Sequence, residues 1–171
     1  MNMWKSFFVS VIIILCAALI ESVILSNITI LPAIPDLVMI CVLYISLENG
    51  KLMGETTGFV SGLFLDFMSA CPFGLNCLLR TILGYIGGLF NKTFNTDGFF
   101  IPSLLGLCTT ISKALLLWFF SFLYPSSVVA YNPFTLSFLF EIIFNVVLTP
   151  FIFKLLKLFK NSLLLKPETI I

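Results

Sequence analysis

Residues 53–90 read MGETTGFVSGLFLDFMSACPFGLNCLLRTILGYIGGLF, and this stretch predicts a pair of antiparallel apolar helices. Two apolar segments, residues 53–70 and 75–90, flank the sequence CPFG at residues 71–74, whose proline and glycine are typical of a tight turn. Each segment approaches the ~20 residues that cross the apolar core of a bilayer. The stretch therefore predicts a transmembrane helical hairpin.

The composition of the whole chain places the hairpin in an integral membrane protein. Of the 171 residues, 60% are hydrophobic and 10% are charged, and the mean hydropathy is +1.15. A soluble domain could not cover that much apolar surface. Apolar segments consume nearly the whole length, which leaves no room for a soluble catalytic domain. The net charge of +1, carried by scattered lysines, argues against nucleic-acid binding.

Six apolar segments follow one another along the chain, separated by short clusters of turn-forming residues. They are residues 7–30, 35–47, 53–70, 75–90, 99–124 and 134–159. The first is too long for a cleaved signal sequence and contains Glu21, so we interpret it as a retained span. In the second, about thirteen residues at ~1.5 Å each give roughly 20 Å against a core of ~30 Å, which leaves a half-span possible.

The distribution of basic residues predicts the topology. Six spans with a cytoplasmic N-terminus place seven lysines on the cytoplasmic side: Lys5, Lys51, Lys92, Lys154, Lys157, Lys160 and Lys166. Arg80 and Lys113 lie within spans, and the outer loops contain no basic residue, as the positive-inside rule requires. We therefore expect an all-α integral membrane protein with one six-helix domain over residues 1–171. Both termini are expected to be cytoplasmic, and the clustered C-terminal lysines should reach anionic headgroups of the lipid bilayer.

Five ionisable residues lie inside the predicted spans, where an unpaired charge is costly. They are Glu21, Asp66, Arg80, Lys113 and Glu141. Asp66 lies four residues before the end of its segment and Arg80 five after the start of the next, so the hairpin brings them to matching depth. We expect an intramembrane ion pair between them. It would be either a structural clamp or part of a docking or ligand site.

The other three ionisable residues, Glu21, Lys113 and Glu141, also fall at similar depths in the outer half of the bundle. A flexible lysine can span the roughly 6 Å between the expected depths of Lys113 and Glu141. Two arrangements remain open: isolated structural pairs, or a polar cavity open to the outer face.

Glycines recur at four-residue spacing on both helices of the hairpin. They are Gly54, Gly58 and Gly62 in the first helix, and Gly84 and Gly88 in the second. Small residues at this spacing let helix backbones approach closely in lipid. The glycines therefore indicate either packing between these two helices or a groove for a helix of another protein.

Residue patterns for catalysis, metal binding and cofactor binding are missing. The chain contains no histidine, no Cys-x-x-Cys and no phosphate-cradling glycine loop, so we expect no enzymatic activity, metal or cofactor. Cys71 and Cys77 flank the predicted turn and could pair in an oxidising compartment.

Several short fragments between residues 35 and 90 resemble the MreD family, the small membrane subunit of the bacterial rod-shape system. They are Pro35-Asp36-Leu37, Tyr44, Gly58 and Gly62 with Leu65-Asp66, Pro72-Phe73-Gly74-Leu75, Arg80, and Gly84-Tyr85. The resemblance implies a multi-pass protein of the bacterial cytoplasmic membrane that binds the transmembrane helix of MreC. It also implies a place in the elongation complex with MreB, RodA and a penicillin-binding transpeptidase, which directs peptidoglycan synthesis and cell shape.

A competing interpretation is the solute-binding membrane component of a vitamin-type importer, which also has six helices. An outer polar cavity would suit that function. A small permease would require internal repeats with broken helices, and we find no convincing repeat.

Overall fold

The computed structural model describes residues 3–24, 33–69, 72–94, 96, 98–123 and 135–163, and the regular structure in these ranges is helical. The elements are α1 (Met3–Leu19) continued by the π-helical turn η1 (Ile20–Ile24), α2 (Leu37–Asn49), α3 (Lys51–Met68), α4 (Leu75–Leu89), α5 (Phe100–Leu123), α6 (Leu136–Leu158) and α7 (Lys160–Leu163). Each predicted apolar segment overlaps one of the helices α1 to α6, and α1, α2 and α3 extend beyond the predicted bounds at one end.

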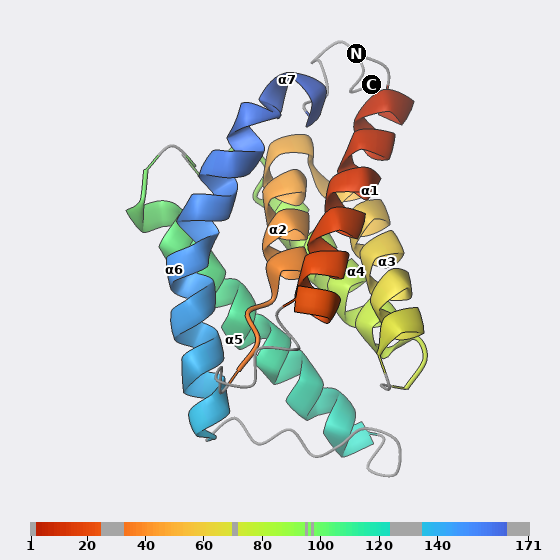
Figure 1. The fold of residues 1–171 in the computed structure, drawn as a ribbon, viewed down its shortest axis with the longest axis vertical. Helices are drawn as coiled ribbons and strands as arrows, with labels where there is room; N and C mark the ends of the chain where they lie inside the picture. The colour runs from red at the N-terminus through yellow and green to blue at the C-terminus, as the bar shows by residue number, and fades with distance from the viewer. Residues whose placement is uncertain are drawn as a thin grey trace.

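The helices α1 to α6 run alternately up and down, so the start of α1 and the end of α6 lie at the same end of the molecule (Figure 1). The short helix α7 packs against α1 at that end. Within the described residues, three helices are long and apolar enough to cross a membrane: Trp4–Val23, Phe100–Leu123 and Leu136–Leu158. Helices α2 and α4 are apolar but shorter, with 13 and 15 residues.

The short helix α2 forms the centre of the fold. Every residue from Val38 to Leu47 is buried, and α2 packs against α1, α3, α4 and α6. The ring of Tyr44 meets that of Phe153 of α6 edge to face, with centroids 5.1 Å apart. A helix that is apolar all round is one that protein surrounds. Burial among its neighbours therefore explains how α2 tolerates a length too short to span the bilayer.

The hairpin of α3 and α4 is the closest helix pair, and its glycines make that contact possible. A Cβ atom added at Gly54 would collide with the backbone carbonyl of Gly84, and one at Gly58 with that of Arg80. Gly62 and Gly88 likewise face the backbone of the opposite side of the hairpin. Of the two interpretations of the glycine pattern, the structure supports packing between α3 and α4. Because the backbones already touch at these glycines, a helix of another protein cannot bind there.

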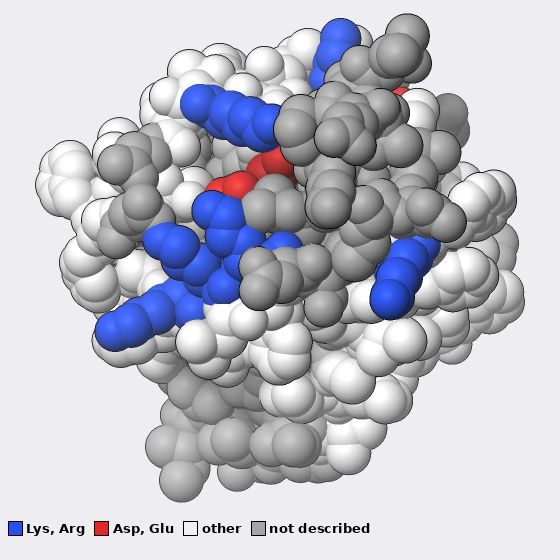
Figure 2. Space-filling model, turned by 90° about the horizontal axis from the view of Figure 1, so that it is seen from above, with Lys and Arg blue, Asp and Glu red and all other residues white. Residues whose placement is uncertain are grey.

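Lysines gather at the end where α1 and α3 begin and α6 ends. Figure 2 looks onto this end and shows Lys and Arg side chains spread across it. The described lysines whose helix positions place them there are Lys5, Lys51, Lys92, Lys154, Lys157 and Lys160. Lys166 lies outside the described residues. In the described part of the chain, the two remaining basic residues, Arg80 and Lys113, lie within helices α4 and α5.

Candidate functional site

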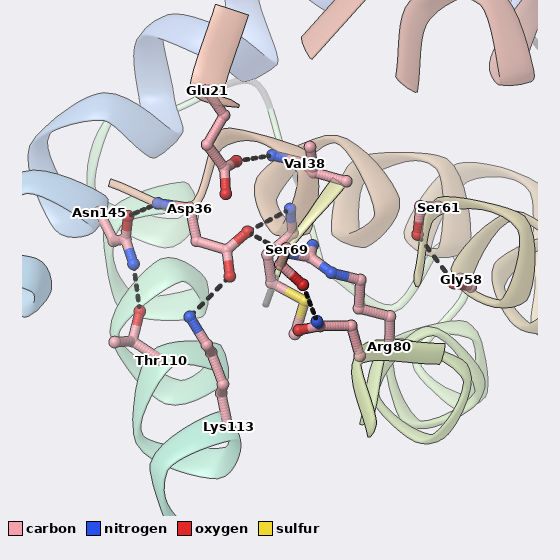
Figure 3. Close-up of polar contacts among 12 residues, drawn as sticks. Glu21, Asp36, Val38, Gly58, Ser61, Ser69, Arg80, Thr110, Lys113 and Asn145 are labelled. Carbon is pink, nitrogen blue, oxygen red and sulfur yellow. Dashed lines mark hydrogen bonds and ion pairs between the residues drawn. The ribbon is translucent and has the colours of Figure 1, made fainter. Parts of the chain in front are cut away.

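Asp36, which precedes the first turn of α2, is the centre of a buried network of charges (Figure 3). Its side chain is 4% exposed, and its Oδ1 atom accepts a hydrogen bond of 2.9 Å from the backbone N–H of Met39. The carboxylate thus caps the N-terminus of α2, where backbone N–H groups have no partner within the helix. Because α2 is short, this cap lies inside the bundle.

Two cations from different helices meet this carboxylate. Arg80 of α4 donates from Nη2 to Oδ1 at 2.8 Å, and Lys113 of α5 donates from Nζ to Oδ2 at 2.7 Å. The Lys113 ammonium also contacts Oε1 of Glu141 on α6 at 2.8 Å. Two acids therefore balance two bases, which is the condition under which buried charges are tolerated.

Neutral polar groups extend the network to the remaining helices. Asn145 of α6 accepts from the backbone N–H of Asp36 at 2.9 Å and donates to Oγ1 of Thr110 at 3.1 Å. Glu21, in the π-helical turn η1, accepts from the backbone N–H of Val38 at 3.1 Å. The network therefore connects η1, α2, α4, α5 and α6, so it fixes how these helices are arranged.

The expected ion pair between Asp66 and Arg80 is wrong. The Asp66 carboxylate instead accepts from the backbone N–H groups of Gly74, Asn76 and Cys77 at 3.0, 3.0 and 3.1 Å, and from the Asn76 side chain at 3.0 Å. It caps α4 from the adjacent helix, because the unpaired N–H groups of a helix N-terminus attract a carboxylate. Arg80 is directed to Asp36 instead.

The expected grouping of Glu21, Lys113 and Glu141 is partly present. Lys113 and Glu141 pair, whereas the Glu21 side chain accepts a hydrogen bond from the backbone of α2. The void beside Asp36, Arg80 and Lys113 measures about 10 Å³. That is about the minimum space for one water molecule and far below the few hundred Å³ of a small-molecule pocket. In the described part of the chain, the network is therefore a closed structural centre and not a solute cavity.

Sequence reasoning missed the central residue of the network. Asp36 was assigned only to the opening of the second helix, and Asn145 was not singled out. The signal was the length of α2: in the predicted six-span arrangement, a helix of about 20 Å in a ~30 Å core would have one end inside the bilayer. An acid at that end needs cationic partners, and Arg80 and Lys113 were the two intramembrane bases in the sequence.

The cysteines and possible metal ligands add no second site within the described residues. Cys77 has a free thiol that contacts the backbone oxygen of Phe59 at 3.6 Å, while Cys71 lies outside those residues. Across the described ranges, no three side chains of His, Cys, Asp or Glu come together as metal ligands.

Comparison with known proteins agrees with the resemblance seen in the hairpin. Searches of curated proteins and of solved structures find no match. The family model described as rod shape-determining protein MreD matches residues 3–159, which is nearly the whole chain. The chain therefore belongs to the MreD family of rod shape-determining membrane proteins.

Proposed function

We propose that this chain is a non-enzymatic subunit of the bacterial cell-elongation complex and acts by binding other membrane proteins. The closed charge centre carries the proposal, together with the family membership. The intramembrane ionisable groups neutralise one another or cap helices, and the space beside them holds about one water. In the part of the chain that the structure describes, this charge centre offers neighbouring proteins shape and packing rather than a reactive group or a solute pocket.

The proposed orientation has six spans and both termini in the cytoplasm of a bacterial inner-membrane protein. The clustering of lysines at the α1 and α7 end supports it, because cytoplasmic ends of membrane helices are enriched in Lys and Arg (Figure 2). The N-terminal end of α2, which Asp36 caps, then lies in the outer half of the bilayer.

The proposed partner is the transmembrane helix of MreC, and the proposed docking position is a groove between α4 and α5. This groove measures about 160 Å³. It is lined by Leu43, Leu47, Leu83, Ile86, Gly87, Phe90, Leu105, Cys108, Thr109 and Ser112. Small and weakly polar residues such as Gly87, Cys108 and Ser112 are typical of helix interfaces in lipid, where close packing drives association.

Further members of the complex are proposed to be MreB, RodA and a penicillin-binding transpeptidase, assembled around MreC and this chain. The large lipid-facing area of the α5 and α6 hairpin supports multiple contacts. Its exposed aromatic side chains include Phe119, Phe122 and Phe151.

The docking position is tested by filling the groove without adding charge. Cys108→Phe should reduce co-purification of MreC in mild detergent, because the new ring occupies the groove. Leu115→Phe is the matched control: it lies two turns further along α5, it is 61% exposed, and it is outside the groove lining. Equal loss of MreC from both variants, or from neither, would contradict the assignment of the groove.

The cellular function is tested by depletion. Elongating cells that lose the protein should become round, with wall synthesis no longer confined to the sidewall and with normal uptake of small solutes. The variant Cys108→Phe should reproduce the rounding, and Leu115→Phe should not. Cells that keep their shape but lose uptake of a nutrient would overturn the proposal.

A further inference from the structure

A second groove lies between α1 and α3 at the lysine-rich end. It measures about 260 Å³ and is lined by Trp4 and Phe7 of α1 and by Leu52, Met53 and Thr56 of α3. Both helices begin at this end, so the groove opens at the membrane surface. At ~1.5 Å per residue, the lining from Leu52 to Thr56 extends roughly 6 Å down the helix axis, which corresponds to the upper part of a lipid acyl chain.

The interior of this groove is apolar. Met53 is 3% exposed and is the buried member of the lining, while Trp4 and Leu52 are 69% and 62% exposed. The one hydroxyl in the lining, that of Thr56, already donates to the backbone oxygen of Leu52 at 2.8 Å. Apart from the Thr56 hydroxyl, the polar side-chain group in this lining is the indole N–H of Trp4, so the lining offers a hydrocarbon chain a largely apolar surface.

Two exposed lysines are sequence neighbours of residues that line the groove, as is the acid Glu55. Lys5 follows Trp4 on α1, Lys51 precedes Leu52 on α3, and both side chains are exposed. Neither ammonium group forms an ion pair with a described residue, including Glu55 one turn below Lys51. A membrane surface attracts such lysines most strongly where its headgroups are anionic.

We propose that the groove between α1 and α3 binds one anionic phospholipid, with an acyl chain against Phe7 and Met53 and the phosphate between Lys5 and Lys51. The exposed indole of Trp4 then acts like other interfacial aromatic residues: its apolar ring lies beside the acyl chain and its N–H lies beside the headgroup. The proposal is independent of the groove between α4 and α5 and of any protein partner.

The chain contains two tryptophans, Trp4 in this groove and Trp118 on α5, which is 57% exposed and outside it. This arrangement provides a direct test by fluorescence quenching with brominated lipids. The full chain is reconstituted in phosphatidylcholine vesicles that contain a minority of phosphatidylglycerol. Bromine is carried either by the phosphatidylglycerol or by the same mole fraction of phosphatidylcholine. The variants Trp118→Phe and Trp4→Phe isolate the two reporters.

Trp4 should be quenched more by brominated phosphatidylglycerol than by brominated phosphatidylcholine. Each of the two lysines should contribute a factor of roughly five to the preference of the groove for the anionic lipid. Trp118 should show no preference. The double variant Lys5→Gln/Lys51→Gln should abolish the preference at Trp4, and Thr56→Phe should reduce quenching by both lipids because it fills the groove. Lys154→Gln, at the same end of the molecule but on α6, is the control that should change nothing.

Three outcomes would overturn the proposal. The first is equal quenching of Trp4 by the two lipids, which would mean ordinary lipid contact. The second is a preference that survives the double lysine variant. The third is protection of Trp4 from both brominated lipids, which would mean that a second copy of the chain covers the groove.

Discussion

Replacing Asp36 with asparagine tests whether this residue is the centre of the fold. The substitution keeps the size of the side chain and an oxygen that can accept from Met39, so the cap of α2 is retained. It removes the negative charge that Arg80 and Lys113 share at 2.8 and 2.7 Å. Lys113 keeps its ion pair with Glu141, whereas Arg80, whose side chain is 6% exposed, loses its ion pair with Asp36.

The magnitude follows from this arrangement. Leaving one buried charge without its partner costs about 3–5 kcal/mol, so Asp36→Asn should lower the free energy of unfolding by that amount. Asp36→Ala should cost about 1 kcal/mol more, because it also removes the cap. Arg80→Gln should cost less, about 1.5–3 kcal/mol for a lost charge-assisted hydrogen bond, because Asp36 keeps Lys113.

The double variant Asp36→Asn/Arg80→Gln provides the decisive comparison, because it removes one charge of each sign and leaves the pair of Lys113 and Glu141. Its loss of stability should be smaller than the sum of the single losses by about 1–3 kcal/mol. The assay is equilibrium unfolding in mixed micelles, followed by helical circular dichroism. Asp66→Asn combined with Arg80→Gln is the control, and these two losses should add within about 0.5 kcal/mol. Additive losses in the Asp36 double variant, or strong coupling in the control, would refute the network around Asp36.

The remaining predictions concern the hairpin and the topology. Asp66→Ala removes the acceptor for four hydrogen bonds at the start of α4 and should lower stability in the same assay by about 2 kcal/mol; an unchanged midpoint would show that water replaces the cap. Gly58→Ala should reduce accumulation in the membrane, because its methyl group meets the backbone of α4, whereas Gly98→Ala, with open space around it, should not; equal immunoblot signals would contradict the packing role. Cysteine probes in a background without reactive thiols should be labelled from the cytoplasm at Asn49 and from outside at Phe73, and the reverse pattern would exclude the proposed orientation.

The helices could be predicted from the sequence because the bilayer imposes a simple rule. Apolar runs near ~20 residues must be helical, since backbone polar groups in lipid have no other partners. The predicted segment 75–90 corresponds to Leu75–Leu89, and segment 99–124 to Phe100–Leu123. The turn between α3 and α4 was predicted from Pro72 and Gly74, and Gly74 has the positive φ of 94° that favours glycine there.

The candidate site was predicted only in part. The cost of burying a charge in lipid predicted that Arg80, Lys113 and Glu141 would have partners, and the structure pairs all three. Depth along the helices was the one coordinate that the sequence supplied, and depth alone paired Arg80 with Asp66. The sequence did not show in which direction around the helix axis each side chain points. It also did not show that the free N–H groups at the start of α4 compete with Arg80 for the Asp66 carboxylate.

The sequence by itself therefore determined the membrane class of the protein, the order of the six longer helices that the structure describes, and most of the charges that needed partners between them. Each of these depends on composition and on position along the chain. The tertiary structure alone decided that α2 is the central helix, that Asp36 lies inside the bundle, and that the glycines of α3 and α4 face each other. These features depend on how each helix is rotated and on which neighbours surround it, and contacts between distant parts of the chain set both.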